Sequence, residues 1–256
     1  MCGRTEQSFD LAELRARFLL SGRAAAPNIP PRWNAAPTQD LAVIHAAHDP
    51  AVESGRAAML ARWGLVPSWA KDPKIAFSTI NDRDVDENGV SIDRKPAFRD
   101  AFRARRCLVP VNGFYEWKTL NSEMKGSREK QPYRFALASG EIMAFAGLWE
   151  TWRSPGGERL HSFTIVTTAA NALLAPLHHR MPVILGEDAW SLWLGEEAAD
   201  AETLKALLKP FPENALTMWP VSRRLNNVRN EGADLAEPVP EPVSIGVGPS
   251  AQGSLF

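Results

Sequence analysis

Short stretches of aromatic and β-branched residues recur along the chain and outnumber the stretches with helical spacing. Such residues favour strands because they pack well on a pleated, half-buried surface. Strands are expected, in chain order, at 41–47, 57–66, 106–117, 132–138, 142–150 and 160–168. Apolar residues at helical spacing predict helices at 10–20, 96–106 and 187–195. Because strands and helices do not alternate regularly, the sequence predicts a single α+β domain with a largely antiparallel, barrel-like β-sheet core and peripheral short helices.

This domain is expected to span residues 2–237 and to be followed by a flexible tail over 238–256. The tail is rich in Pro, Gly and Ser, and it holds too few apolar residues to pack against the domain. A chain of 256 residues buries a sizeable core without covalent crosslinks. Its two cysteines are too few for a disulfide framework, which favours a reducing, intracellular setting.

Several classes of protein are disfavoured by the composition. No apolar run approaches the length of a membrane span, and residues 1–10 lack the apolar segment of a signal peptide. The five histidines and two cysteines show no metal-ligand spacing, so neither a metal nor a cofactor is expected. The net charge is −1, but an excess of Lys and Arg lies within residues 1–135, which makes this half the better candidate for binding an anion.

The second residue of the chain is Cys2, and this position gives it a chemistry of its own. Once Met1 is removed, Cys2 carries a free α-amine and a thiol on one residue. The α-amine has a pKa of about 7.7–8.0, so a useful fraction is neutral and nucleophilic at physiological pH. The amine can attack an aldehyde to give an imine, and the adjacent thiol can then close a thiazolidine ring. The alternatives are an amidohydrolase nucleophile with its own amine as base, or a cysteine without a role.

Ordered sequence blocks cover nearly the whole domain. They are MCGR at 1–4, WNAAPTQ at 33–39, WGLVPSW at 63–69, INDR at 80–83, RRCLVPVNGFYEW at 105–117, FAGLWE at 145–150, FTIVTTAAN at 163–171, LHHRMPVIL at 177–185 and WPVSRRLNNVRNEG at 219–232. In these blocks the chain resembles the SRAP family, the SOS response-associated peptidases, also called abasic-site processing proteins. The resemblance extends over about residues 2–237.

The resemblance implies a DNA repair activity without a cofactor. Members of the family capture the ring-opened aldehyde of an abasic site in single-stranded DNA through an N-terminal cysteine. Carried over block by block, Cys2 is the nucleophile, and Asn81 holds the α-amine and the sugar in place. Glu116 is the general acid and base for the imine and ring-forming steps, and His178 moves a proton at the sugar oxygen.

The same carry-over assigns DNA-binding residues. Arg4 and Arg83 are expected to hold the phosphates that flank the lesion, because a planar guanidinium matches phosphate geometry. Trp69 is expected to stack on a base, a contact that tolerates any sequence. Asn34 lies in the same set, and we expect it to shape the site more than to take part in the chemistry.

The chain departs from the family pattern beside the INDR block. Asp82 stands where the family often has a small residue, and Asp84 and Asp86 follow shortly after. Extra acids at this place would weaken a nearby phosphate contact. Two further residues are expected to be structural, with His179 on the surface and Cys107 buried in a strand.

Three functions from different classes remain open on the sequence alone. The first is covalent capture of abasic sites, with slow turnover and a secondary lyase activity through the imine. The second is an N-terminal cysteine peptidase or amidohydrolase, for which loss of Met1 is a self-cleavage. The third is a single-strand-binding module that forms no covalent bond. We favour the first, because the chemistry of Cys2 and the resemblance agree. It implies a cytoplasmic, nucleoid-associated protein that acts on abasic single-stranded DNA at replication gaps.

A second partner is predicted from the tail. Gln252, Leu255 and Phe256 resemble the bacterial sliding-clamp-binding motif, a glutamine followed by a Leu-Phe pair. Leu255 and Phe256 would be the apolar anchors of a peptide in a groove, and Gln252 would be its polar contact. The alternative is a flexible tail in which two apolar residues follow each other by chance.

Overall fold

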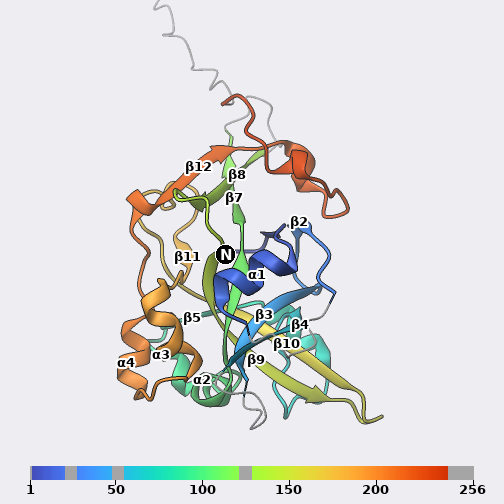
Figure 1. Ribbon diagram of the computed structural model, residues 1–256, viewed down its shortest axis with the longest axis vertical. Coiled ribbons are helices and arrows are strands. Elements are labelled where there is room, and N and C mark those ends of the chain that lie inside the picture. The colour runs from blue at the N-terminus through green and yellow to red at the C-terminus, as the bar shows by residue number, and fades with distance from the viewer. Residues whose placement is uncertain (1, 21–27, 48–54, 121–128, 242–256) are drawn as a thin grey trace, which may run out of the picture.

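The computed structural model describes residues 2–20, 28–47, 55–120 and 129–241, and it holds two mainly antiparallel β-sheets with short helices around them (Figure 1). The predicted α+β class is therefore confirmed. Within the described residues, the first sheet is antiparallel throughout and has the order β12 (Leu216–Pro220), β8 (Lys130–Leu137), β7 (Gly113–Thr119), β1 (Thr5–Gln7) and β2 (Arg32–Ala35).

The second sheet closes on itself, because β9 pairs with both β6 and β10. Its order is β11 (Arg180–Pro182), β10 (Arg159–Ala169), β4 (Gly55–Trp63), β3 (Asp40–Ala47), β6 (Arg106–Val111) and β9 (Met143–Arg153). The three-residue strand β5 (Asn81–Arg83) joins β10 in parallel, as β4 also does. This closure gives the barrel-like core that the sequence predicts.

One predicted strand is wrong in its continuity. The stretch 106–117 forms two strands in different sheets, β6 and β7, and the chain passes between them at Asn112. The side-chain oxygen of Asn112 accepts the main-chain N–H groups of Ser8 and Phe9 at 2.9 and 3.1 Å. The main-chain N–H of Asn112 donates to the main-chain carbonyl of Glu6. The Asn112-Gly113 pair and this tertiary contact with the start of the chain therefore end the first strand.

The α-helices of the described residues are short. Three of them lie where the sequence predicts helices, with narrower bounds, and the helix at Ala201–Ala206 was not predicted. The first begins at a capping box in which Asp10 and Glu13 each accept the other's main-chain N–H at 2.8 Å. The α-helices are α1 (Leu11–Phe18), α2 (Arg99–Ala104), α3 (Trp190–Leu194) and α4 (Ala201–Ala206). The 3₁₀ turns are η1 (Pro73–Ser78), η2 (Ile92–Arg94), η3 (Glu187–Ala189), η4 (Glu213–Ala215), η5 (Arg223–Asn226) and η6 (Ala233–Leu235). In the described ranges, no helix is long and apolar enough to cross a membrane.

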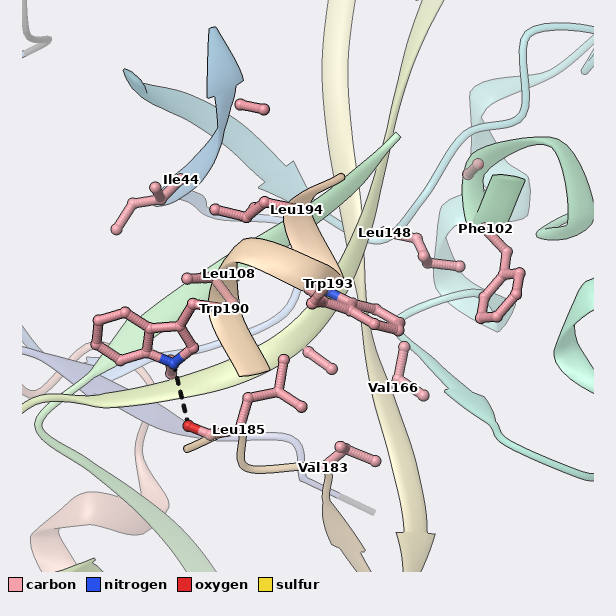
Figure 2. Close-up of a cluster of buried hydrophobic side chains, with 14 of the residues drawn as sticks. Ile44, Phe102, Leu108, Leu148, Val166, Val183, Leu185, Trp190, Trp193 and Leu194 are labelled. Carbon is pink, nitrogen blue, oxygen red and sulfur yellow. Dashed lines mark hydrogen bonds between the residues drawn. The ribbon is translucent and has the colours of Figure 1, made fainter. Parts of the chain in front are cut away.

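Two large buried clusters hold these elements together. The cluster in Figure 2 packs α3 against the second sheet, and the indole N–H groups of Trp190 and Trp193 donate to the carbonyls of Leu185 and Cys107 at 3.1 and 2.9 Å. The other cluster joins side chains from both sheets and includes Cys2. Cys107 is fully buried, which confirms its expected place in a strand. The N-terminal cysteine is therefore held in the core between the two sheets.

Candidate functional site

Cys2 is fixed by a long-range contact with the start of β5. Its main-chain carbonyl accepts the side-chain amide of Asn81 at 2.8 Å, and both residues are buried. The carbonyl of Arg4 accepts the main-chain N–H of Tyr115 at 3.0 Å, which lays the first residues along β7 next to Glu116. The structure therefore brings together Cys2, Asn81 and Glu116 from three separate parts of the sequence.

Burial dominates the electrostatics of Cys2 and Glu116. It raises the pKa of the Cys2 thiol far above its ordinary value, and the negative charge of Glu116 adds to this shift. Burial also raises the pKa of Glu116 to about 7, and Lys130 opposes this rise in part. Near neutral pH the thiol is therefore protonated, and the Glu116 carboxyl exchanges between its two forms. A carboxyl with a pKa close to the working pH can both give and take a proton.

Glu116 opens into a pocket of about 950 Å³ that contains two more of the predicted site residues. Arg4 and His178 line this pocket together with Glu116. Residues that the sequence did not single out complete its wall, among them Trp117, Lys130, Arg223 and Asn226. We call it the Glu116 pocket. Its wall holds three cationic side chains and the carboxyls of Glu116 and Glu129, of which Glu129 pairs with Arg223 at 2.8 Å. The remaining excess of positive charge suits an anionic ligand such as a nucleic-acid backbone.

His178 is neutral at pH 7 in this environment. Burial lowers its pKa to about 4, and the neighbouring His179, whose ring stacks at 4.5 Å, contributes to this. The Nδ1 atom of His178 accepts the main-chain N–H of Arg180 at 3.0 Å, so the neutral ring carries its proton on Nε2. His179 is exposed, as expected for a surface residue.

Arg4 is held in place by a buried network. Its Nη1 donates to Oδ1 of Asn34 at 2.5 Å and to the carbonyl of Leu225 at 2.9 Å, and its guanidinium lies over the Trp117 ring. The Asn34 amide donates to carbonyls of the 225–230 segment at 2.9 to 3.3 Å. Because Asn34 is fully buried, the geometry fits the expected shaping role and leaves no surface for direct contact with DNA.

Arg83 lies beside Asn81 in a second, smaller pocket of about 330 Å³ at the end of β5. The Arg83 guanidinium forms an ion pair with Glu87, four residues further on. The acids that depart from the family pattern have other partners. Asp84 accepts the Thr168 hydroxyl at 3.0 Å, while Asp86 accepts main-chain N–H groups within its own loop. Among the acidic residues that the structure describes in this segment, Glu87 is therefore the one that competes directly for Arg83.

The predicted base-stacking residue Trp69 lies away from these two pockets. Trp69 is 56% exposed on the loop after β4 and lines neither of them. Its neighbour Ala70 anchors that loop by accepting the indole N–H of Trp152 at 2.7 Å. The predicted clamp-binding residues 252, 255 and 256 lie outside the described residues, as does Met1.

Sequence reasoning missed several charged residues of the site. Lys130 lies outside the strands predicted at 106–117 and 132–138, yet it starts β8 and lines the Glu116 pocket. Arg223 and Asn226 come from η5, within the Arg- and Asn-rich block at 219–232. Arg180 is buried in β11, and its Nη2 has no hydrogen-bond partner among the described residues. The density of Arg and Asn in the block at 219–232 is the sequence signal that points to Arg223 and Asn226.

The chain was compared with known proteins. The family model for SOS response associated peptidase (SRAP) matches residues 1–228. The abasic site processing protein YoqW of Bacillus subtilis is 34% identical over 93% of this chain and 99% of its own length. The rat abasic site processing protein HMCES is 32% identical over 93% of this chain and 76% of its own length.

Solved structures give the same fold. A crystal structure of a protein from Bacteroides thetaiotaomicron matches with a TM-score of 0.76 at 23% identity, over 93% of this chain and all of that one. A protein from Bordetella bronchiseptica matches with a TM-score of 0.68 at 27% identity, over 86% of this chain and all of that one. The fold and the family model define a single-domain protein of the SRAP type. The chain belongs to the SRAP family.

Proposed function

We propose that this protein repairs DNA by capturing abasic sites in single strands covalently, through the α-amine and thiol of Cys2 once Met1 has been removed. The observation that carries the proposal is the convergence on Cys2: Asn81 holds its carbonyl at 2.8 Å, and Glu116, with a pKa raised to about 7, lies beside it. The names of the relatives, abasic site processing proteins, support the same substrate.

The first chemical step uses the amine. The neutral α-amine of Cys2 attacks the aldehyde carbon of the ring-opened sugar, and a carbinolamine forms. Glu116 in its protonated form gives a proton to the carbinolamine hydroxyl, which leaves as water. The nitrogen keeps its own hydrogen, so a protonated imine (C=N+–H) forms and Glu116 is left as a carboxylate. His178, neutral in the free protein, takes and returns a proton at the sugar oxygen as the ring opens.

The second step uses the thiol. The Glu116 carboxylate takes the thiol proton as the Cys2 sulfur attacks the imine carbon, which restores the protonated Glu116. The C=N π electrons move to nitrogen, which keeps the hydrogen it already holds. The product is a thiazolidine, and the sum of both steps is protein plus aldehyde giving adduct plus one water. Ring closure is intramolecular, which favours it by roughly 7–11 kcal/mol in well-oriented cases. The imine also permits a secondary lyase activity.

The DNA strand is held by the remaining residues. Arg4 in the Glu116 pocket and Arg83 beside Asn81 take the phosphates on either side of the lesion. The exposed Trp69 stacks on a base further along the strand. Asn34 contributes indirectly, since it orients Arg4.

The protonated state of the thiol disfavours the peptidase alternative. An acyl-enzyme mechanism needs a thiolate or a base that makes one, and burial together with Glu116 holds the pKa of the Cys2 thiol high. Capture through the amine needs no thiolate for its first bond. A purely non-covalent single-strand-binding protein would not need a buried, oriented Cys2 at all.

Intact mass spectrometry tests the proposal. The purified full chain is measured alone and after incubation with a single-stranded oligonucleotide that contains one abasic site. We expect a protein that lacks Met1, and an adduct that equals protein plus DNA minus one water and survives heating. The matched controls are the undamaged oligonucleotide and Cys2→Ala, which should give no heat-stable adduct. An unmodified wild-type protein after incubation would rule the proposal out.

A further inference from the structure

The strand that carries Asn81 and Arg83 is short and paired on one side. Within the described residues, β5 pairs with β10 alone, over Ile165↔Asn81, Val166↔Asp82 and Thr167↔Arg83. Three residues of parallel ladder provide few hydrogen bonds. The directions of Asn81 and Arg83 therefore depend on what fixes the other edge of β5.

Lys95 fixes that other edge. Its Nζ donates to the main-chain carbonyl of Arg83 at 2.6 Å and to Oδ1 of Asp82 at 2.8 Å. The Lys95 and Asp82 side chains are only 12% and 7% exposed, so each charge depends on the other for compensation. On the opposite edge, the hydroxyl of Thr167 donates to the carbonyl of Asp82 at 2.8 Å. The middle residue of β5 is thus held from both sides.

Lys95 is itself anchored to the rest of the fold. It follows η2 directly, and its main-chain carbonyl accepts the N–H groups of Phe98 and Arg99 at 3.0 and 2.9 Å where α2 begins. Phe98 and the following Phe102 belong to the large cluster under α3. Lys95 therefore transmits the position of this helix to β5.

Side chains alternate along a strand, so Asp82 points away from the face that Asn81 and Arg83 share. Fixing Asp82 therefore fixes the direction of both neighbours. The amide of Asn81 then reaches the carbonyl of Cys2 at 2.8 Å, while the two hydrogen bonds of the Lys95 ammonium go to β5 itself.

We propose that Lys95, paired with Asp82, is a positioning residue for the capture of abasic sites: it holds β5 so that Asn81 orients Cys2 and Arg83 meets the phosphate. This inference rests on the proposed function. It assigns a use to Asp82, which stands where the family often has a small residue. A displacement of about 1 Å at a reacting group can lower a rate by roughly 100-fold, so a contact this close to the site has a large effect.

The test measures the crosslinking rate of Lys95→Met with a saturating concentration of abasic single-stranded oligonucleotide. We expect the maximal rate to fall by roughly 10- to 100-fold. Lys209→Met removes the same charge from an exposed lysine and should leave the rate unchanged. Lys95→Arg keeps the charge and a donor, and it should recover part of the rate. All rates are measured well below each variant's melting temperature.

A double-mutant cycle separates positioning from general destabilisation. If Lys95 acts through Asn81, the double variant Asn81→Ala with Lys95→Met should be no slower than Asn81→Ala alone. Fully additive losses, or a folded Lys95→Met that crosslinks at the wild-type rate, would overturn the inference. Should Lys95→Met fail to fold, Asp82→Ala with Lys95→Met removes both buried charges and serves in the same cycle. A wild-type protein that forms no adduct would instead refute the proposed function.

Discussion

The side-chain amide of Asn81 donates to the main-chain carbonyl of Cys2 at 2.8 Å, across 79 positions of sequence. This bond holds the residue whose amine and thiol we propose to react. The Oδ1 atom of Asn81 is buried and has no hydrogen-bond partner among the described residues, so an acceptor is available next to Cys2. During the attack, the Asn81 amide N–H can therefore hold the carbonyl of Cys2, and Oδ1 of Asn81 can accept a hydrogen bond from the α-amine of Cys2.

Replacing Asn81 with alanine should slow crosslinking and leave DNA binding nearly intact. Without the amide, Cys2 is no longer oriented, and we expect a maximal rate lower by roughly 10- to 100-fold. Affinity for undamaged single strands should change little, since Asn81 is buried. Rates come from denaturing gels and affinities from fluorescence anisotropy. The exposed Asn214→Ala is the control, and an equal loss of rate there would argue against a specific role for Asn81.

The pH dependence of crosslinking should report Glu116. The proposed mechanism needs a protonated Glu116, and this form is lost as pH rises through about 7. It also needs a neutral α-amine, and this form is gained as pH rises through about 7.7–8.0. The wild-type rate should therefore peak near these values and fall on both sides. Glu116→Gln should be slower by roughly 100-fold or more and should lose the alkaline decline. If the rate of Glu116→Gln still falls at alkaline pH, a group other than Glu116 causes the decline.

Glu116 should also reduce the stability of the fold at alkaline pH. Its pKa is about 7 in the folded protein against an ordinary 4.5, so the folded state binds more protons than the unfolded state between these values. Stability therefore falls as pH rises through this window. Relative to wild type, Glu116→Gln should melt at a higher temperature at pH 8 and lose that advantage towards pH 4.5. The exposed Glu197→Gln should show no such trend in thermal melts.

The longer strands were predictable because their residues suit a strand locally, whereas the short strands β1, β2, β5, β11 and β12 and the change of sheet at Asn112 were not predicted. The Asn112-Gly113 pair is a local turn signal within the run from Arg106 to Trp117. The change of sheet itself depends on the N–H groups of Ser8 and Phe9 reaching the Asn112 side chain. A local pattern cannot contain a partner a hundred positions away.

The candidate functional site, like the fold, could be predicted from the sequence only where the evidence is local. The chemistry of Cys2 follows from its position in the chain and could be derived without a fold. Asn81, Glu116 and His178 came from the family resemblance alone, because their convergence is a property of the tertiary structure. Lys95 could not be predicted for the same reason, since only the tertiary fold places its ammonium on the Arg83 carbonyl.

The ion pair between Glu87 and Arg83 should weaken DNA binding, because the carboxylate occupies the guanidinium that we assign to a phosphate. Glu87→Gln should bind undamaged single strands roughly two- to five-fold more tightly, the range expected for one exposed ion pair. The gain should vanish in an Arg83→Ala background, where the salt dependence of binding is also flatter. Anisotropy titrations at several salt concentrations measure both effects. A gain that persists without Arg83, or an equal gain in Glu197→Gln, would show a general charge effect.

The tail should bind a bacterial sliding clamp through Gln252, Leu255 and Phe256. The chain is anchored to the domain up to Glu241, whose carboxylate accepts the Tyr133 hydroxyl at 2.8 Å. The predicted motif follows within fifteen residues, on a stretch rich in Pro, Gly and Ser. A buried Leu or Phe side chain contributes roughly 1.5–3 kcal/mol before ordering costs, so we expect a dissociation constant on the order of micromolar.

Titration of a peptide with the sequence of residues 245–256 against the clamp of the same organism measures this affinity. Leu255→Ala with Phe256→Ala should abolish binding, because both apolar anchors are lost, while Ser250→Ala outside the motif should have no effect. Binding to the clamp would keep the domain near single-stranded gaps at a raised effective concentration. Crosslinking of a short abasic oligonucleotide should be the same with and without the double substitution, since the clamp has no part in the chemistry. Binding that survives the double substitution, or none at high micromolar peptide, would exclude the motif.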